Sequence, residues 1–326
     1  MIRARYPDIF HGHKRKRNFF EGWYFKISDP TEQYVLAVIP GIFLGKGAGD
    51  SHSFIQLVHG SEAYFRYLSF PVESFKAQKD TFAIAVENNT FSLKQMSLNI
   101  EDQSFTVRGD LSFHNILTWP DTFLNPGSMG FYNYIPRMQC YSQVCALNME
   151  LEGKLVINNN KIDFSGGRGY VEKNWGSAFP YSWIWIQSNN FTSTPASLSC
   201  SLGHIPFLFG SFRGFLIGLA VEQQFYSFTT MNRSRCRIRQ TGGDIFMEVQ
   251  NSRHTLTIKT RTSPDKFVEL HGPRDGRMVP LVQENLQGMV RVELKERSGK
   301  ILFSDEGSCS GIEYGGRQML VLDQQG

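Results

Sequence analysis

A carboxyl group, an amide and several aromatic rings lie close together in the middle of the sequence, within residues 166–187. If residues 170–175 form a strand, the alternation of side chains places Tyr170, Glu172 and Asn174 on one face. A hydrophobic core does not need a glutamate and an asparagine among glycines and aromatic rings. Burial beside such rings disfavours the ionised form of a carboxyl group and keeps it protonated near neutral pH. We therefore assign Glu172, Asn174 and Tyr170 as candidate catalytic residues.

The following segment adds tryptophan rings to the same region. In residues 181–187, alternation puts Trp183, Trp185 and Gln187 on one face and two isoleucines on the other. Aromatic faces stabilise a positive charge that develops near them. We therefore predict that these three residues, together with Trp175, bind the substrate. The alternative interpretation is that the polar side chains hydrogen-bond a loop at a domain junction while the tryptophans only pack.

A second carboxyl group shares a strand face with a tryptophan near the start of the chain. Within residues 19–26, alternation places Glu21, Trp23 and Phe25 on the same face. This pattern predicts a cavity wall, so we assign Glu21 and Trp23 to substrate binding and keep Glu21 as the alternative acid. An edge glutamate paired with a nearby arginine explains the pattern equally well.

Metal and cofactor motifs are weak or missing. The histidines His11 and His13 would be poor metal ligands in a terminal segment, and the five cysteines are scattered without a C-x-x-C pair. The glycine-rich stretch 166–169 lacks the G-x-x-x-x-G-K-[ST] pattern of a phosphate loop. We therefore predict no metal site and no cofactor. The basic run Lys14–Arg17 would attract anionic lipid head groups, although a solvated surface tail is the alternative.

Period-two alternation and runs of β-branched or aromatic residues extend over most of the chain, and helix-period patterns are nearly absent. The pattern predicts about sixteen strands, whereas about eight already fill a small barrel. We therefore predict an all-β fold of two consecutive antiparallel barrels or curved sandwiches with little helix. The boundary is expected near Pro180, with domains at residues 1–180 and 181–326.

Composition narrows the possible partners and compartment. A net charge of +4 over 326 residues is too weak to indicate a nucleic-acid partner. No apolar run reaches the ~18 residues of a transmembrane helix, and the first residues do not form a secretory signal. Scattered cysteines favour free thiols in a reducing compartment. We expect a cytoplasmic protein; the sequence does not indicate an oligomeric state.

Three motifs resemble the tocopherol cyclase family, and the resemblance extends over nearly the whole chain. They are Phe20-Glu-Gly-Trp-Tyr-Phe-Lys, then Gly169-Tyr-Val-Glu-Lys-Asn-Trp-Gly-Ser with Phe179-Pro and Trp183-x-Trp-x-Gln, and finally Gly311-Ile-Glu-Tyr-Gly. The first two are specific in combination, and the last is weak alone. The family is distantly similar to carotenoid hydratases and other two-domain lipocalin-like proteins. The resemblance therefore implies that each predicted β domain is lipocalin-like.

The resemblance also implies a reaction, the closure of a chromanol ring on a prenylated benzoquinol. A trisubstituted alkene is protonated, and the phenol oxygen attacks the tertiary carbocation. Glu172 would then be the acid, the tryptophans the cation-tolerant wall, and Asn174 or Tyr170 the hydrogen-bonding partner of the phenol. A lyase that hydrates an isoprenoid double bond and a non-catalytic binder of an apolar lipid remain open alternatives.

The expected partner is therefore an apolar small molecule, a prenylquinol or another isoprenoid. Plant members of the family carry plastid targeting sequences, and no such sequence is recognisable here, which favours a bacterial protein. We expect it to meet its ligand at the inner membrane surface, with peripheral contact through the basic segment Lys14–Arg17.

Overall fold

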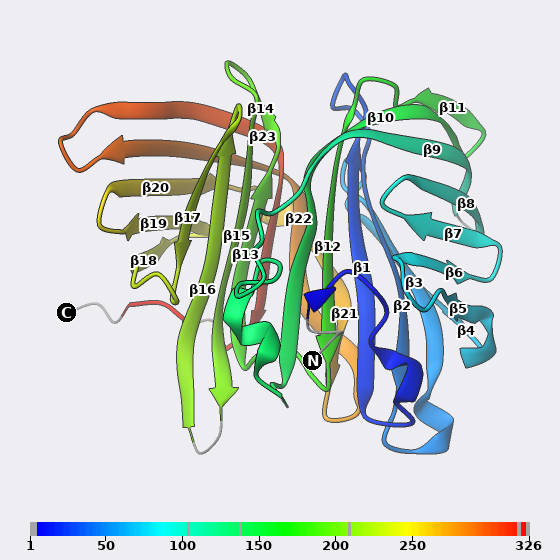
Figure 1. Ribbon diagram of the computed structural model, residues 1–326. Helices are drawn as coiled ribbons and strands as arrows, with labels where there is room; N and C mark the ends of the chain where they lie inside the picture. Colours follow the sequence, from blue (N-terminus) through cyan, green and yellow to red (C-terminus); the bar gives the residue numbers. More distant parts are fainter. Residues whose placement is uncertain (1–4, 103–104, 137, 208–209, 318–320, 324–326) are drawn as a thin grey trace. The chain divides into compact units, whose positions relative to one another are not determined.

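Antiparallel β-strands make up nearly all of the regular structure (Figure 1). The computed structural model describes residues 5–102, 105–136, 138–207, 210–317 and 321–323. These residues contain no α-helix, and none of them forms a helix with the length and apolar character needed to cross a bilayer. The 3-10 turns that lie wholly within the described residues are η2 (Gly12–Lys14), η3 (Ala48–Asp50), η4 (Val72–Ser74), η5 (Gly130–Tyr134) and η6 (Pro264–Lys266). The predicted all-β fold with little helix is confirmed.

The chain divides into two compact units. Unit 1 comprises residues 1–59, 65–179 and 271–279, and unit 2 comprises residues 60–64, 180–270 and 280–326. One change of unit therefore falls between Phe179 and Pro180. Each unit also includes a short segment from the other half of the sequence, so neither is a single continuous stretch of chain.

The first sheet has twelve antiparallel strands, in the order β4-β3-β2-β1-β12-β10-β9-β8-β7-β6-β5, with β11 beside β10. Its strands are β1 (Phe19–Ser28), β2 (Val35–Leu44), β3 (His52–His59), β4 (Tyr64–Phe70), β5 (Phe75–Ala77), β6 (Ala83–Val86), β7 (Asn89–Ser92), β8 (Gln95–Asp102), β9 (Phe105–Leu117), β10 (Cys140–Ile157), β11 (Asn160–Asp163) and β12 (Arg168–Gly176).

This sheet is strongly curled, because rings from strands far apart in its order touch one another. The Trp23 ring of β1 lies 6.2 Å from the Phe75 ring of β5 and 5.6 Å from the Phe82 ring. The neighbouring Phe25 ring lies 5.5 Å from the Phe91 ring of β7. These rings fill the concave side, where aromatic pairs pack with offset or edge-on geometry. The odd-numbered side chains of β1 therefore point into the core of unit 1.

The second sheet has eleven strands, in the order β17-β16-β15-β13-β23-β22-β20-β19-β18, with β14 beside β23 and β21 beside β22. Its core is mostly aliphatic and includes Ile184 and Ile186. Its strands are β13 (Ser182–Ser188), β14 (Asn190–Phe191), β15 (Ala196–Phe207), β16 (Gly210–Val221), β17 (Gln224–Thr229), β18 (Arg235–Thr241), β19 (Asp244–Gln250), β20 (His254–Arg261), β21 (Val268–Arg274), β22 (Arg277–Glu296) and β23 (Ile301–Gly316).

Strand β12 lies between β1 and β10, and its two charged side chains, Glu172 and Lys173, point to opposite faces of the sheet. Lys173 pairs with Trp23 across the β1 ladder, and Glu172 pairs with Tyr24. Directly opposed residues in an antiparallel pair share a face. The odd-numbered residues of β12 therefore point to the concave side with Trp23, and the even-numbered ones point to the convex side.

Candidate active site

The three predicted catalytic residues of β12 lie together on its convex face. The Tyr170 hydroxyl donates to Oε2 of Glu172 at 2.6 Å, and the Asn174 amide donates to Oε1 at 3.5 Å. The Ser142 hydroxyl of β10 also donates to Oε1, at 2.9 Å. Glu172 is 4% exposed and Tyr170 is fully buried. The arrangement is a carboxyl group removed from water and held by hydroxyl groups.

An apolar cluster lies on the same side of the sheet. Phe20 pairs with Gly176 across the β1–β12 ladder, which places the Phe20 ring on the Glu172 face. Phe20, Phe43 and Phe54 form one buried cluster, and Cys140 packs against this cluster. Burial raises the pKa of the Cys140 thiol, and the negative charge of Glu172 adds to this effect. Glu172 therefore lies on the same face of the sheet as an aromatic surface contributed by β1, β2 and β3.

A glycine on β2 makes room for this surface. A Cβ atom at Gly41 would overlap the Phe54 ring and lie 2.7 Å from the backbone oxygen of Glu21. Gly22, its neighbour across the ladder, has more room, because a Cβ there would lie 3.6 Å from Phe54. The position of the Phe54 ring thus requires glycine at 41 but not at 22.

Trp175 and Glu21, two of the predicted substrate-binding residues, lie on the opposite face of this part of the sheet. Glu21 forms an ion pair with Lys173, with 2.6 Å between Oε1 and Nζ, and both side chains are fully buried. The ammonium group lies 5.1 Å from the Trp23 ring and 4.4 Å from the Trp175 ring. Burial lowers the pKa of Lys173, and the carboxylate of Glu21 opposes that effect.

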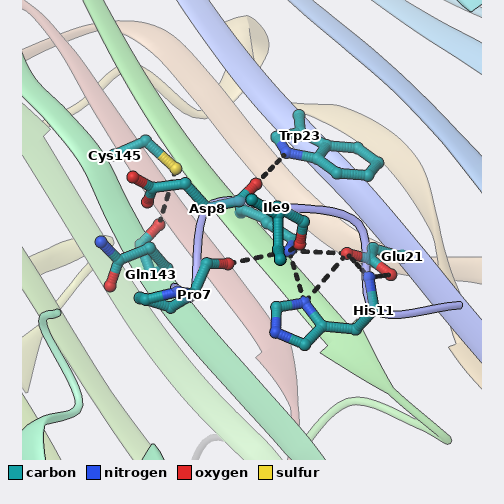
Figure 2. A network of polar contacts seen from close by, with 9 residues as sticks. Pro7, Asp8, Ile9, His11, Glu21, Trp23, Gln143 and Cys145 are labelled. Carbon is teal, nitrogen blue, oxygen red and sulfur yellow. Dashed lines mark hydrogen bonds and ion pairs between the residues drawn. The ribbon is translucent and has the colours of Figure 1, made fainter. Parts of the chain in front are cut away.

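The ion pair also fastens the N-terminal segment onto the sheet (Figure 2). Lys173 donates to the backbone oxygens of Pro7, at 2.8 Å, and of Ile9. The backbone N–H of His11 donates to both carboxyl oxygens of Glu21, at 3.0 and 2.9 Å. Backbone groups of the segment thus satisfy much of the hydrogen-bonding capacity of two buried charges.

The imidazole of His11 completes this network. Its Nδ1 lies 2.8 Å from Nζ of Lys173 and 3.4 Å from Oε1 of Glu21. The ring stacks on Trp175 with 4.5 Å between centroids, and Trp175 stacks on Tyr141 at 5.2 Å. Trp175 therefore lies between the rings of His11 and Tyr141 on the concave side, on the opposite face from Glu172.

Asp8 is a further acidic group in the segment shown in Figure 2. Burial raises its pKa, while hydrogen bonds from Cys145 and Gln143 and the charge of Lys173 act in the other direction. Its Oδ1 finds no hydrogen-bond partner among the described residues. Asp8 therefore favours the neutral form more than an exposed aspartate does.

The remaining predicted residues, Trp183, Trp185 and Gln187, belong to unit 2. All three are buried, on the face of β13 opposite the isoleucines of the aliphatic core. The indole N–H of Trp183 donates to the carboxyl group of Glu313 on β23. Glu313 lies directly opposite Trp185 on one side and the fully buried Glu284 on the other. This face of unit 2 thus combines indole rings with carboxyl groups.

Sequence reasoning missed Lys173 and underrated His11. A signal for Lys173 was present, because Glu21-x-Trp23 and Lys173-x-Trp175 each place a charge and a tryptophan on one strand face. What the sequence did not show is that β1 and β12 pair in the register that opposes these two faces. Across the described ranges, no group of three or more His, Cys, Asp or Glu side chains is arranged to hold a metal ion.

The sequence comparisons match this chain to tocopherol cyclases or to their family. A family model described as tocopherol cyclase-like matches residues 92–316. The probable chloroplastic tocopherol cyclase of Oryza sativa subsp. japonica is 22% identical over 222 residues, which cover 65% of this chain and 47% of the rice protein. The chain thus spans about half the length of that relative. The chloroplastic tocopherol cyclase of Zea mays is 22% identical over 375 residues, covering 94% of this chain and 77% of the maize protein.

Solved structures share the fold. The crystal structure of CghA with Sch210972 has a TM-score of 0.61 at 11% identity, and the match covers 92% of this chain and 88% of that one. Kievitone hydratase from Nectria haematococca has a TM-score of 0.51 at 12% identity, covering 95% and 94%. At these identities the likeness shows the fold alone.

Proposed function

The chain belongs to the tocopherol cyclase-like family, and from this premise we propose that it catalyses the acid-driven ring closure of a prenylated quinol or a related isoprenoid. The observation that carries the proposal is the buried carboxyl group of Glu172, held by two hydroxyl groups on the sheet face that also carries an aromatic cluster. Ring closure of this type starts with protonation of an alkene, which needs a strong acid shielded from water.

In the proposed reaction, Glu172 delivers its proton to the alkene and leaves a tertiary carbocation. The phenol oxygen of the substrate bonds to the cation and loses its own proton, which restores the acid. One C–H and one C–O bond form while an O–H bond and a π bond break, so the product is an isomer of the substrate. The reaction needs neither an oxidant nor a cofactor.

The partners of Glu172 suit an acid that gains and loses a proton. Each hydroxyl group, on Tyr170 and on Ser142, can donate to the ionised carboxylate or accept from the protonated carboxyl group. Glu21 is in a different position, because the ammonium group of Lys173 can only donate and therefore stabilises the ionised form. This contrast favours Glu172 over Glu21 as the acid.

Tyr170 and Asn174 are proposed to position the acid and the phenol, since polar groups beside the reacting atoms fix their orientation. In unit 1 the cation-tolerant surface would come from Phe20, Phe43 and Phe54, since aromatic faces stabilise positive charge. In unit 2, Trp183 and Trp185 remain proposed substrate-binding residues, with Gln187 beside them.

Hydration is the alternative reaction. The same protonation yields an alcohol if water captures the cation, and kievitone hydratase has a similar fold. A protein that binds the isoprenoid without turnover is the third possibility. The products separate the three, because ring closure gives a chromatographically distinct isomer of the same mass, hydration adds one water, and a carrier returns the ligand unchanged.

The test is incubation with a prenylated quinol, with the compounds separated by chromatography and their masses measured for the wild type and for Glu172→Gln. Glutamine keeps the size of the side chain but has no acidic proton, so turnover should fall by at least ~10²-fold while ligand affinity changes little. Glu152→Gln is the matched control, because the Glu152 side chain is 71% exposed on β10 and should leave turnover unchanged. Near-full activity of Glu172→Gln would overturn the assignment.

We also propose that the protein meets its apolar substrate at the cytoplasmic surface of a membrane. The run Lys14–Arg17 is exposed. Phe123, Leu124 and Phe131 are 64%, 71% and 58% exposed, and the Arg5 guanidinium lies 4.6 Å from the Phe123 ring. Exposed apolar side chains beside cations are typical of surfaces that enter the head-group region of anionic bilayers.

A further inference from the structure

A groove in unit 1 is separate from the Glu172 site and has the size of a small-molecule site. Its volume is about 770 Å³, and ligand sites typically have volumes of ~300–1,000 Å³. Its lining comes from the N-terminal segment up to the start of β1, from η5 and the start of β10, and from the end of β12. Trp175 lines it from the concave face of β12, whereas Glu172 is on the convex face.

Apolar side chains form a large part of the groove wall. Phe19 and Met138 are 3% and 6% exposed, and Ile135 is half-buried. A methionine side chain is unbranched and adapts to the shape of the group that it contacts. This part of the wall therefore suits a flexible alkyl chain.

The charge carried by the groove wall is positive. Arg15 lines the groove, and none of the described residues that line it is an aspartate or a glutamate. The Arg15 guanidinium lies 5.6 Å from the centroid of the Phe19 ring, so the cation is held beside the apolar wall. A guanidinium group only donates hydrogen bonds, and it can bind a carboxylate through two of them.

Trp175 adds to this positive character. Its ring stacks with His11 and Tyr141, and the planes differ by only 8° and 9°. Because Trp175 lies between these two rings, it presents the edge of its indole to the groove. The edge of an aromatic ring is the positive end of its quadrupole. A negative group in the groove is therefore favoured by Trp175 as well as by Arg15.

We infer that this groove binds one molecule of an anionic amphiphile, a carboxylate carried on a single alkyl chain. The apolar wall takes the chain, and Arg15 pairs with the carboxylate. The inference goes beyond the proposed function, because the ligand is charged, is not turned over and does not meet Glu172. It also differs from the proposed membrane contact, because a single dissolved molecule binds without a bilayer.

The test is calorimetric titration of the intact protein with dodecanoate and with dodecylammonium, each below its critical micelle concentration. The two probes carry opposite charges on chains of equal length. Dodecanoate should bind saturably, one molecule per chain, and at least about tenfold more tightly, because Arg15 attracts its head group and repels the other. Equal affinity for the two probes, or tighter binding of dodecylammonium, would overturn the inference, and this comparison needs no variant to fold.

Variants at two cations of the same run locate the head group. Arg15→Gln should weaken dodecanoate binding about three- to tenfold, the effect of losing a charge-assisted contact at an exposed site. Arg17→Gln is the matched control, because Arg17 is exposed and does not line the groove, and it should bind dodecanoate as the wild type does. An equal loss in both variants would show that the basic run as a whole attracts the probe, and the groove assignment would be wrong.

A second pair of variants locates the alkyl chain. Ile135→Glu places a negative charge in the groove wall and should weaken dodecanoate binding at least about tenfold. Ile301→Glu is the matched control, because Ile301 is 54% exposed in unit 2, and it should leave binding unchanged. Glu172→Gln should also retain full binding. If Glu172→Gln abolished binding while Ile135→Glu did not, the probe would occupy the Glu172 site and the inference would fail.

Discussion

At the scale of single residues, Lys173 is a charged side chain with no exposure to solvent. It is fully buried and its ammonium group contacts a carboxylate, two backbone oxygens and an imidazole nitrogen. Lys173→Met would leave the carboxylate of Glu21 buried without a cation. Breaking a buried pair in this way costs about 3–5 kcal/mol. We expect a corresponding loss in the free energy of unfolding, measured by urea denaturation.

A double variant separates the energetic contribution of the Glu21–Lys173 ion pair from that of the other contacts of Lys173. Glu21→Gln combined with Lys173→Met removes both charges, so it should be less destabilised than the sum of the two single variants by more than about 1 kcal/mol. A coupling energy near zero would show that the contacts of Lys173 with Pro7 and Ile9, rather than the ion pair, account for its contribution.

At the scale of elements, the packing of β2 on β1 depends on Gly41. Gly41→Ala should lower the free energy of unfolding by about 1–3 kcal/mol, as overpacking of a core does, because the new Cβ meets the Phe54 ring and a backbone oxygen. Gly22→Ala is the matched control, since its Cβ makes an ordinary contact and the strand loses less entropy on folding. Equal destabilisation by both variants in thermal unfolding would contradict this account.

At the scale of the whole molecule, the proposed membrane contact predicts binding to lipid vesicles. Replacing the four cations of Lys14–Arg17 by glutamine should weaken sedimentation with anionic vesicles at least tenfold, because each cation near such a surface contributes roughly 1 kcal/mol. Arg235, Arg237, Arg239 and Lys259 are exposed cations of unit 2, and their replacement is the matched control. If the wild type did not sediment with anionic vesicles, the proposed contact would be refuted.

The sequence by itself determined the all-β fold and the face that Tyr170, Glu172 and Asn174 share. Both follow from period-two alternation, which is a local property of an extended chain. The predicted boundary near Pro180 and the roles of the site residues stay predictions.

The tertiary structure decided which distant groups meet. Glu21 was predicted to form part of a cavity wall, with pairing to an arginine as the alternative, and the cation that it meets is Lys173. Trp175 was assigned with Glu172, yet its described neighbours are His11 and Tyr141 on the other face of the sheet. Both outcomes depend on the register between β1 and β12 and on the path of the N-terminal segment. Strand register and loop path are set by packing between residues far apart in the sequence, so no local pattern encodes them.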